Sequence, residues 1–230
     1  MGIRICEIYR SKQGEGRLTG TESWFVRTSG CNLRCWFCDT PFSSWEPEGE
    51  TMSVEQIMAK LGFDQARHIV LTGGEPMLPN EIQELTRQMK LAGFHITIET
   101  AGTIFRDVNC DLMSISPKLS NSTPDTKRAG QWSVRHEQRR HQPDVIRQLV
   151  AKFDYQFKFV VDQPNDLPEI EQYLEEFSGI RPENIHLMPQ GTNPAELELR
   201  RQWLEPHCDN SGYQYCPRMH IKWYGNKRGT

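Results

Sequence analysis

Three cysteines, Cys31, Cys35 and Cys38, lie within eight residues in a Cys-x3-Cys-x2-Cys pattern. Thiolates this close in sequence cannot reach three unrelated places, and they are suited to hold one soft metal centre. A structural zinc site normally takes four protein ligands, and an electron-transfer cluster is normally held by four cysteines. A compact group of three therefore predicts a 4Fe–4S cluster with one iron open to a small ligand. The alternatives, three buried structural cysteines or an incomplete zinc knuckle, are disfavoured by so specific a spacing.

Composition limits the classes to which the chain can belong. It has 230 residues, 37% of them hydrophobic and 25% charged, and a formal net charge of −3. This negative balance argues against a nucleic-acid partner, and the absence of a long apolar run argues against a membrane. Residues 1–6 lack the pattern of a signal peptide. Seven cysteines, three of them crowded, are typical of a reducing compartment, so we expect a cytoplasmic protein.

Short apolar strands alternate with amphipathic helices along most of the chain. The core strands are expected at residues 24–28, 68–71, 94–100, 112–116 and 155–161, and a sixth strand with its exit loop is expected at residues 185–191. This alternation predicts an α/β fold with a largely parallel sheet and helices packed outside it. About six parallel core strands favour a partial (β/α) barrel that is open on one side. We expect one domain over residues 1–230, with its motifs gathered at the rim where the strands end.

Two parts of the chain depart from this alternation. Residues 120–143 show no apolar period, so we expect a solvated loop or a mobile flap within a variable insertion around residues 119–150. The basic residues in it could touch RNA, but charge runs are usually only solvated. Residues 213–218 and 219–224 look strand-like and are expected to close the fold.

Further motifs lie at the ends of the predicted strands. Residues 11–16 contain two glycines that let the backbone approach a ligand, and Gln13 among them offers both a donor and an acceptor. Residues 72–76, Thr-Gly-Gly-Glu-Pro, follow a buried strand directly. Arg27 lies near the end of the strand before the cysteines, where it is either a surface arginine or a bidentate partner of a substrate carboxylate. Glu99 ends another strand, where α/β folds gather ligand groups.

Taken together, these motifs resemble the 7-carboxy-7-deazaguanine synthase family of the radical S-adenosylmethionine (SAM) superfamily. The resemblance is carried by residues 7–16, 25–27, 30–40, 72–76, 99–102, 116–118 and 216–220. It covers nearly the whole chain and is weakest across residues 119–150. It implies a carbon–nitrogen lyase that converts 6-carboxy-5,6,7,8-tetrahydropterin to 7-carboxy-7-deazaguanine with release of ammonia, in the biosynthesis of queuosine and other 7-deazapurines.

The resemblance also implies how the reaction is carried out. SAM bound to the open iron is cleaved by one electron, and the 5′-deoxyadenosyl radical takes a hydrogen from C6 of the pterin. The cofactor thus supplies the difficult step, and no side chain is expected to act as a catalytic acid or base. A magnesium ion, a single-electron donor such as a flavodoxin or ferredoxin, and a homodimer are implied as well.

Site residues follow from the resemblance, position by position. Cys31, Cys35 and Cys38 would hold the cluster, and Thr40 would bind magnesium. The expected SAM contacts are Phe37, Cys38, Asp39, Gly74, Ser116, Pro117, Lys118, Met188, Pro189, Gln190 and Gly191. The expected pterin contacts are Lys12, Gln13, Gly14, Arg27 and Thr72.

Two other functions fit parts of the same pattern. Short radical SAM chains also include activases that place a glycyl radical on a partner protein, and only the synthase would release ammonia without a protein substrate. A non-catalytic iron–sulfur electron-transfer protein is the second alternative, which a fourth cluster ligand from the protein would favour. Thr40 has an alternative of its own, because a threonine hydroxyl often bonds within its own turn.

Overall fold

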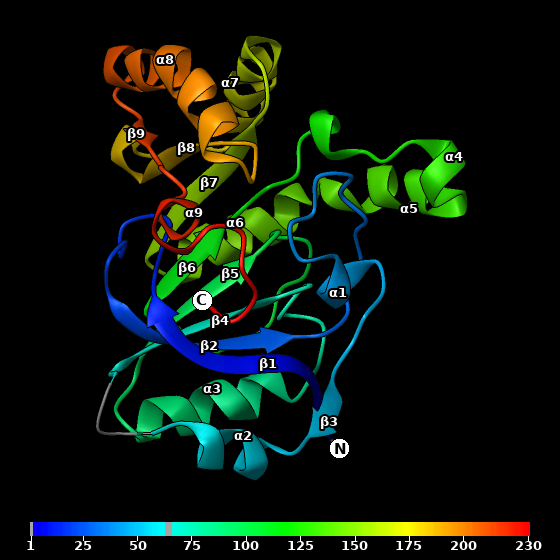
Figure 1. Ribbon diagram of the computed structural model, residues 1–230, viewed down its shortest axis with the longest axis vertical. Helices are drawn as coiled ribbons and strands as arrows, with labels where there is room; N and C mark the ends of the chain where they lie inside the picture. The colour runs from blue at the N-terminus through cyan, green and yellow to red at the C-terminus, as the bar shows by residue number, and fades with distance from the viewer. Residues whose placement is uncertain (1, 63–65) are drawn as a thin grey trace.

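The computed structural model describes residues 2–62 and 66–230, which form one large sheet flanked by helices (Figure 1). The strands in this described part are β1 (Ile3–Lys12), β2 (Glu22–Thr28), β3 (Glu50–Met52), β4 (His68–Gly73), β5 (His95–Thr100), β6 (Leu112–Ile115), β7 (Tyr155–Val161), β8 (Ile185–Pro189) and β9 (Gln214–Tyr215). They are ordered β3-β1-β2-β4-β5-β6-β7-β8-β9. All neighbours from β2 to β9 are parallel, whereas β1 is antiparallel to β2 and β3. The expected α/β class with a mostly parallel sheet is confirmed.

Helices connect these strands and cover the sheet. They are α1 (Pro41–Ser44), α2 (Val54–Lys60), α3 (Ile82–Leu91), α4 (Thr126–Ala129), α5 (Gln131–Arg140), α6 (Pro143–Lys152), α7 (Leu167–Glu175), α8 (Pro194–Ser211) and α9 (Met219–Tyr224). Ser53 and Gln56 bond each other's backbone N–H, and this capping box starts α2. Helix α3 places Ile82, Leu85 and Met89 in the hydrophobic core, all with no exposed surface. Its period of three and four residues is the one that the sequence shows.

The central strands are apolar because helices and neighbouring strands exclude water from them. Ile69, Val70 and Leu71 of β4 have no exposed surface, and neither do Ile96 and Ile98 of β5. Continuous burial of this kind is typical of parallel strands covered on both faces. The sheet is not closed, since β3 and β9 are its two edges among the described strands. This open arrangement agrees with a partial barrel.

The loop between β1 and β2, residues 13–21, brings the first strands against the last ones. The backbone N–H of Met219 donates to the carbonyl of Gly14 at 3.0 Å. The backbone N–H of Gly16 donates to Cys216 Sγ at 3.2 Å. Gly16 has a φ of +75°, a backbone conformation that favours glycine, and a Cβ there would lie 2.2 Å from Gln156 Nε2 and would displace that side chain. We call residues 13–21 the hairpin loop; it contacts Glu99 of β5 and Gln156 of β7.

The expectation of irregular structure over residues 120–143 is wrong, because α4 and α5 lie within that segment. Figure 1 shows them projecting from the body of the molecule. Their contacts with the rest of the chain are largely polar and cationic rather than apolar, which is why no apolar period marks them. The Arg34 guanidinium lies 3.9 Å from the ring centroid of Trp132. His136 is fully buried, accepts from the Arg34 backbone N–H at 3.1 Å, and lies 2.9 Å from Ser122 Oγ.

The expected last strand is also wrong. Residues 219–224 form α9, and only Gln214–Tyr215 of the preceding segment pair with β8, as β9. The contact from Met219 to the hairpin loop anchors the first turn of α9. In the described residues, no helix combines the length and the apolar character needed to cross a membrane.

Candidate functional site

The cysteine loop leaves β2 and is fixed by the exit turn of β4. The backbone N–H of Glu75 donates to the carbonyl of Gly30 at 2.9 Å, and the Gly30 N–H donates to the carbonyl of Ser43 at 2.8 Å. A Cβ on Gly74 would lie 2.1 Å from the Gly30 oxygen. Only glycine at residue 74 therefore lets the cysteine loop pack against this turn. The two strongest sequence motifs are thus in direct contact.

Burial shapes the chemistry of the thiols. Burial raises the pKa of Cys31 and of Cys35 to about 12, so each is protonated at neutral pH until a metal displaces its proton. The Leu33 N–H donates to Cys31 Sγ at 3.4 Å, and Cys38 Sγ lies 3.2 Å from Ser44 Oγ. Hydrogen bonds to sulfur of this kind tune iron–sulfur centres.

The donor set of the cysteine loop consists of three thiols within eight residues. Over residues 2–62 and 66–230, no three His, Cys, Asp or Glu side chains are grouped closely enough to hold a metal ion. Cysteine thiolates are the usual protein ligands of iron–sulfur clusters, so these three soft donors are compatible with a 4Fe–4S cluster.

Aromatic side chains cover the loop. Trp36 and Phe37 meet edge to face, with ring centroids 5.4 Å apart. Trp36 Nε1 donates to the Asn121 carbonyl at 2.6 Å, and Trp45 Nε1 donates to the Cys35 carbonyl at 3.0 Å. Trp36 is nevertheless 41% exposed, so the loop lies close to the molecular surface.

Thr40 follows the last cysteine, and its side chain faces that cysteine. Its Oγ1 lies 3.8 Å from Cys38 Sγ. It does not cap the backbone of α1, although it is the N-cap residue. Its hydroxyl instead accepts from Ser43 Oγ at 3.2 Å. The oxygen therefore keeps acceptor capacity on the side of the cysteine loop.

Glu75 connects the turn after β4 to the carboxyl end of β5. It has no exposed surface, and burial raises the pKa of its carboxyl group. The carboxyl accepts from Thr100 Oγ1 at 2.8 Å, from the Ala101 N–H at 2.9 Å and from the Met77 N–H at 3.0 Å. Glu75 thus joins the carboxyl ends of β4 and β5 and supports the turn that carries Gly74.

The other residues predicted to contact SAM also follow strand ends. Ser116, Pro117 and Lys118 come directly after β6, and Lys118 Nζ bonds the Ser116 carbonyl at 2.6 Å and its Oγ at 2.7 Å. Met188 and Pro189 end β8, and Gln190 and Gly191 follow. The carboxyl ends of parallel strands meet at one edge of a sheet. Gly74 and these two groups therefore share one rim, beside Phe37 and Asp39 of the cysteine loop.

Arg218 connects the rim to the hairpin loop, although the sequence analysis assigned it no role. Its guanidinium donates to Asp39, to the Gly191 carbonyl at 2.6 Å and to Glu15 Oε1 at 3.3 Å. Burial would lower the pKa of Arg218, but Asp39 and Glu15 outweigh it and keep the group charged. One buried arginine thus joins the cysteine loop, the loop after β8 and the hairpin loop.

Gln13 and Thr72, both predicted to bind substrate, meet at Glu99. Gln13 Nε2 donates to Glu99 Oε1 at 3.3 Å, and Thr72 Oγ1 donates to Glu99 Oε2 at 3.0 Å. Lys158 Nζ lies 3.3 Å from Glu99 Oε1 and 2.5 Å from Glu15 Oε2. The sequence analysis did not predict a role for Lys158 or Glu15. We call these five residues the inner polar cluster.

Arg27 is a partly buried arginine rather than a surface one. Its side chain is 14% exposed, and Nε donates to Glu7 Oε1 at 2.7 Å. Nη2 donates to the Tyr9 hydroxyl at 3.0 Å. Burial would lower its pKa, but Tyr9 and Glu7 keep it charged. By contrast, Lys12 is exposed, at the end of β1, and Gly14 is packed against His220.

The register of the sheet places these polar groups in one row. Residue pairs across neighbouring strands join Glu7 to Arg27, Arg27 to Thr72, Glu99 to Ser114, and Ser114 to Gln156. Residues paired across strands point to the same face of a sheet. The signal for the row was present in the sequence, because each of these strands carries a polar residue inside an apolar run.

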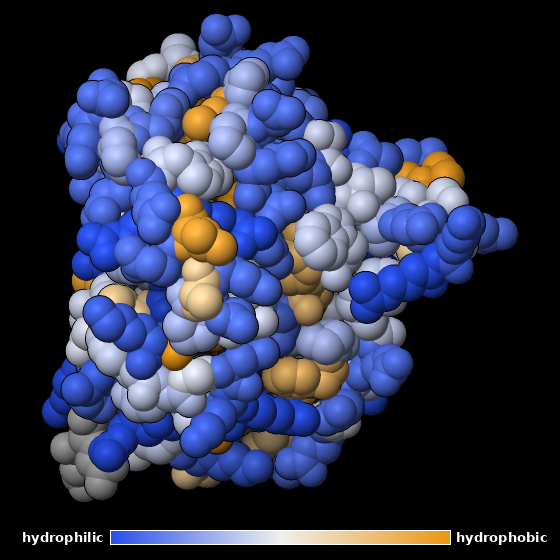
Figure 2. All heavy atoms as spheres, turned by 45° about the horizontal axis from the view of Figure 1, so that its top comes forward, coloured by the Kyte–Doolittle hydropathy of each residue, from blue (hydrophilic) through white to orange (hydrophobic). Residues whose placement is uncertain are grey.

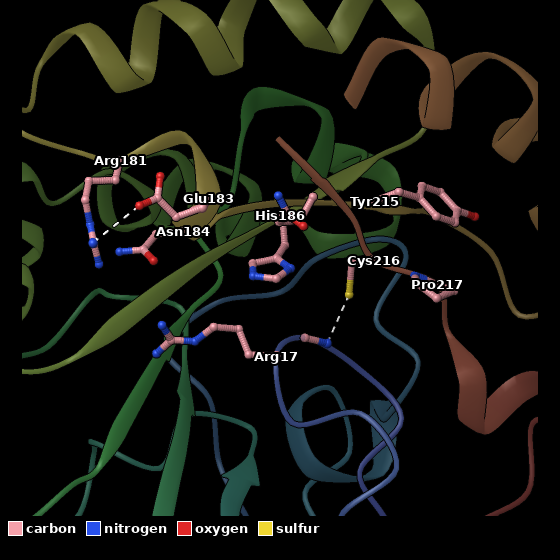
Figure 3. A pocket seen from close by; sticks show the side chains of 10 residues that line it. Arg17, Arg181, Glu183, Asn184, His186, Tyr215, Cys216 and Pro217 are labelled. Carbon is pink, nitrogen blue, oxygen red and sulfur yellow. Dashed lines mark hydrogen bonds and ion pairs between the residues drawn. The ribbon is translucent and has the colours of Figure 1, made fainter. Parts of the chain in front are cut away.

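A separate cavity of about 560 Å³ lies beside the hairpin loop (Figure 3). Arg17, His186 and Cys216 are among its lining residues, and no residue predicted for the cluster, SAM or pterin lines it. His186 Nε2 is buried without a hydrogen-bond partner in the described structure. Burial, with Lys158 and Arg17 nearby, lowers the pKa of His186 to about 4, so the ring is neutral at pH 7.

Comparison with known proteins gives consistent matches. A model of the radical SAM superfamily matches residues 25–130. The 7-carboxy-7-deazaguanine synthase of Rhodopirellula baltica is 48% identical over 229 residues, which cover 99% of this chain and 89% of that protein. The enzyme of the same name from Halobacterium salinarum is also 48% identical, covering 95% of this chain and 89% of its own. The crystal structure of QueE from Escherichia coli shares the fold, with a TM-score of 0.69, 24% identity and 94% of each chain covered.

Proposed function

Because this chain belongs to the 7-carboxy-7-deazaguanine synthase family of the radical SAM superfamily, we propose that it converts 6-carboxy-5,6,7,8-tetrahydropterin to 7-carboxy-7-deazaguanine with release of ammonia. The observation that carries this proposal is the meeting of Gln13 and Thr72 at Glu99, on the face that also bears Arg27. A carboxylate, an amide and a hydroxyl suit the donor and acceptor edge of a pterin ring. A partly buried arginine suits its carboxylate.

Each group of residues then has one task. Cys31, Cys35 and Cys38 hold the cluster, which together with SAM supplies a radical able to take hydrogen from carbon. Phe37, Asp39, Gly74, residues 116–118 and residues 188–191 position SAM. Lys12, Gln13, Gly14, Arg27 and Thr72 position the pterin. Lys158 and Arg218 keep the Glu15, Glu99 and Asp39 carboxylates in place, so the polar face is ordered before substrate binds.

Replacing Arg27 with lysine is expected to weaken pterin binding roughly tenfold or more, because lysine keeps the charge and loses the planar fork. Binding of SAM and the iron content should be unchanged. Equilibrium titration of the pterin and of SAM against the reconstituted protein measures both effects. Arg4→Lys, on the exposed side of β1, is the matched control. An unchanged pterin affinity would assign Arg27 to a structural ion pair with Glu7.

Thr40 is proposed as a ligand of magnesium. Magnesium prefers oxygen ligands and keeps several waters, so one hydroxyl together with oxygens of the substrate can complete its shell. The orientation of Thr40 Oγ1 toward Cys38 supports this position. The ion would stabilise negative charge on the substrate without taking part in redox chemistry.

Thr40→Val is expected to remove most of the magnesium stimulation of turnover, because it keeps the shape and removes the oxygen. The cluster and SAM affinity should be retained, and Thr40→Ser, which keeps the hydroxyl, should retain the stimulation. Rates are measured after thorough chelation and again after magnesium is restored. A wild-type rate that does not respond to magnesium would rule out this site.

Anaerobic turnover tests the proposed reaction directly. Reconstituted protein, SAM, dithionite and the carboxypterin are combined, and 7-carboxy-7-deazaguanine and ammonia are followed by mass spectrometry and ammonia assay. Product formed without any protein substrate supports the synthase and excludes the glycyl-radical activase. Cleavage of SAM with no conversion of the pterin would contradict the proposal.

Several expectations remain as parts of this proposal. We propose that residues 1–230 act as one radical SAM domain, that a flavodoxin or ferredoxin donates the electron, and that the protein works as a homodimer in the cytoplasm. The crowding of three thiols on one loop supports a reducing compartment. Sedimentation of the anaerobic protein measures the oligomeric state.

A further inference from the structure

A basic arm stands beside the cysteine loop of an otherwise acidic protein. The arm is residues 126–141, which include α4 and α5. It contains five Lys or Arg residues and one Glu, which give it a formal charge of +4. Because the whole chain has a formal charge of −3, the remaining residues carry a charge of −7. Figure 2 shows the arm projecting from the body with a largely hydrophilic surface. A concentration of one charge sign on a projection steers partners of the opposite sign.

The arm is built directly onto the loop that carries the cysteines. Arg34, between Cys31 and Cys35 in sequence, lies over Trp132 at 3.9 Å and bonds His136 through its backbone N–H. Arg128 lies 4.4 Å from the ring centroid of Trp45 and donates to the Trp36 carbonyl at 3.3 Å. A partner that binds the arm is therefore held next to the cluster loop.

The exposed side chains on and near the arm are basic and apolar, and both kinds occur in protein–protein interfaces. Lys127, Arg135 and Arg139 are exposed and do not contact the cysteine loop in the hydrogen bonds and ring contacts described. Val134 is 57% exposed, and Trp36 is 41% exposed beside Cys35. Arginine and aromatic residues are enriched at interface centres. The surface therefore combines positive charge with apolar contacts at the place where an electron must enter.

We propose that the arm and Trp36 form the docking surface for a small acidic one-electron carrier protein. The inference rests on the proposed function, because that reaction requires one electron at the cluster. One electron leaves the reduced carrier, which is oxidised by one electron, and the cluster is reduced by the same amount. An acidic face around the carrier's redox group complements the arm, speeds encounter and fixes the orientation of the complex.

The test is a charge reversal of the arm in the reconstituted holoenzyme. Lys127→Glu, Arg135→Glu and Arg139→Glu are combined, and Lys60→Glu, Arg87→Glu and Arg201→Glu form a control with the same change of net charge on α2, α3 and α8. A reduced acidic flavodoxin is the probe. Its affinity for the protein is measured by calorimetry over a range of salt concentrations, and turnover is measured with flavodoxin and with dithionite.

The arm variant is expected to bind flavodoxin roughly tenfold or more weakly and to lose the salt dependence of wild-type binding. Flavodoxin-driven turnover should fall accordingly, whereas dithionite-driven turnover should be unchanged, because dithionite needs no docking surface. The control variant should match the wild type in every measurement. Equal flavodoxin affinity in the arm variant and the wild type would overturn the proposal. Failure of dithionite-driven turnover in the wild type would instead contradict the proposed function.

Discussion

Replacing any one of Cys31, Cys35 and Cys38 with alanine is expected to abolish SAM cleavage. Each cysteine would supply one of three protein ligands of the proposed cluster, so its loss would leave two irons open and the cluster unstable. The wild-type protein, reconstituted without oxygen, should contain about four irons and four sulfides per chain. Iron and sulfide analysis, visible absorption and the release of 5′-deoxyadenosine measure the effect. Cys110→Ala, outside the loop, is the matched control and should retain both cluster and cleavage.

The other cysteines are engaged elsewhere in the fold, which supports a cluster with three protein ligands. Cys6 Sγ lies 3.8 Å from the Phe42 carbonyl, and Cys110 Sγ lies 3.6 Å from the Ile96 carbonyl. Cys216 accepts from the Gly16 N–H, and Cys208 is packed in the hydrophobic core. If Cys6→Ala or Cys216→Ala also removed the cluster, a fourth protein ligand and a simple electron-transfer site would be favoured. Cleavage retained in any of the three loop variants would disprove the ligand assignment.

Much of the fold could be predicted because it depends on local patterns. The capping box of Ser53 and Gln56 and the apolar run of β4 are both visible within a few residues of sequence. The arm could not be predicted in this way. Its helices are held by Trp132 and His136 against Arg34, which is about a hundred residues away, and such contacts leave no apolar period.

The motifs of the candidate site could be predicted from the sequence, but its ion pairs could not. Gln13 and Thr72 stand in recognisable motifs, but their common partner Glu99 was seen only as a strand-end carboxylate. Arg218 reaches Asp39 across 179 residues of chain, and Lys158 reaches Glu15 across 143. Pairings of this range depend on how the sheet curves, which no local pattern specifies. A lysine inside the apolar run of β7 was the available signal, because a buried charge requires a partner.

Lys158→Met is expected to lower the free energy of unfolding at pH 7 by about 3–5 kcal/mol, because it leaves buried carboxylates without their cation. The Lys158 side chain is 5% exposed, and those of Glu15 and Glu99 are 13% and 21% exposed. Burial would raise the pKa of Glu15, but Lys158 and Arg218 outweigh it and hold that pKa far below the ordinary value. In the wild type, this stabilisation is complete above the unfolded pKa of about 4.3 and is lost as the pH falls toward the folded pKa.

The sign of the pH dependence separates this explanation from a simple loss of packing. Without Lys158, the pKa of Glu15 rises, so protonation at lower pH relieves the unpaired charge. The stability difference between wild type and Lys158→Met should therefore be largest at pH 7 and smaller at pH 4.5, in urea unfolding of the reduced protein. Lys60→Met, which breaks an exposed pair with Glu50, should cost less than about 1 kcal/mol. Adding Glu15→Gln to Lys158→Met should restore part of the loss, because the buried charge is removed. A difference independent of pH, with no recovery in the double variant, would mean that Lys158 acts through packing and not as the cation of the inner polar cluster.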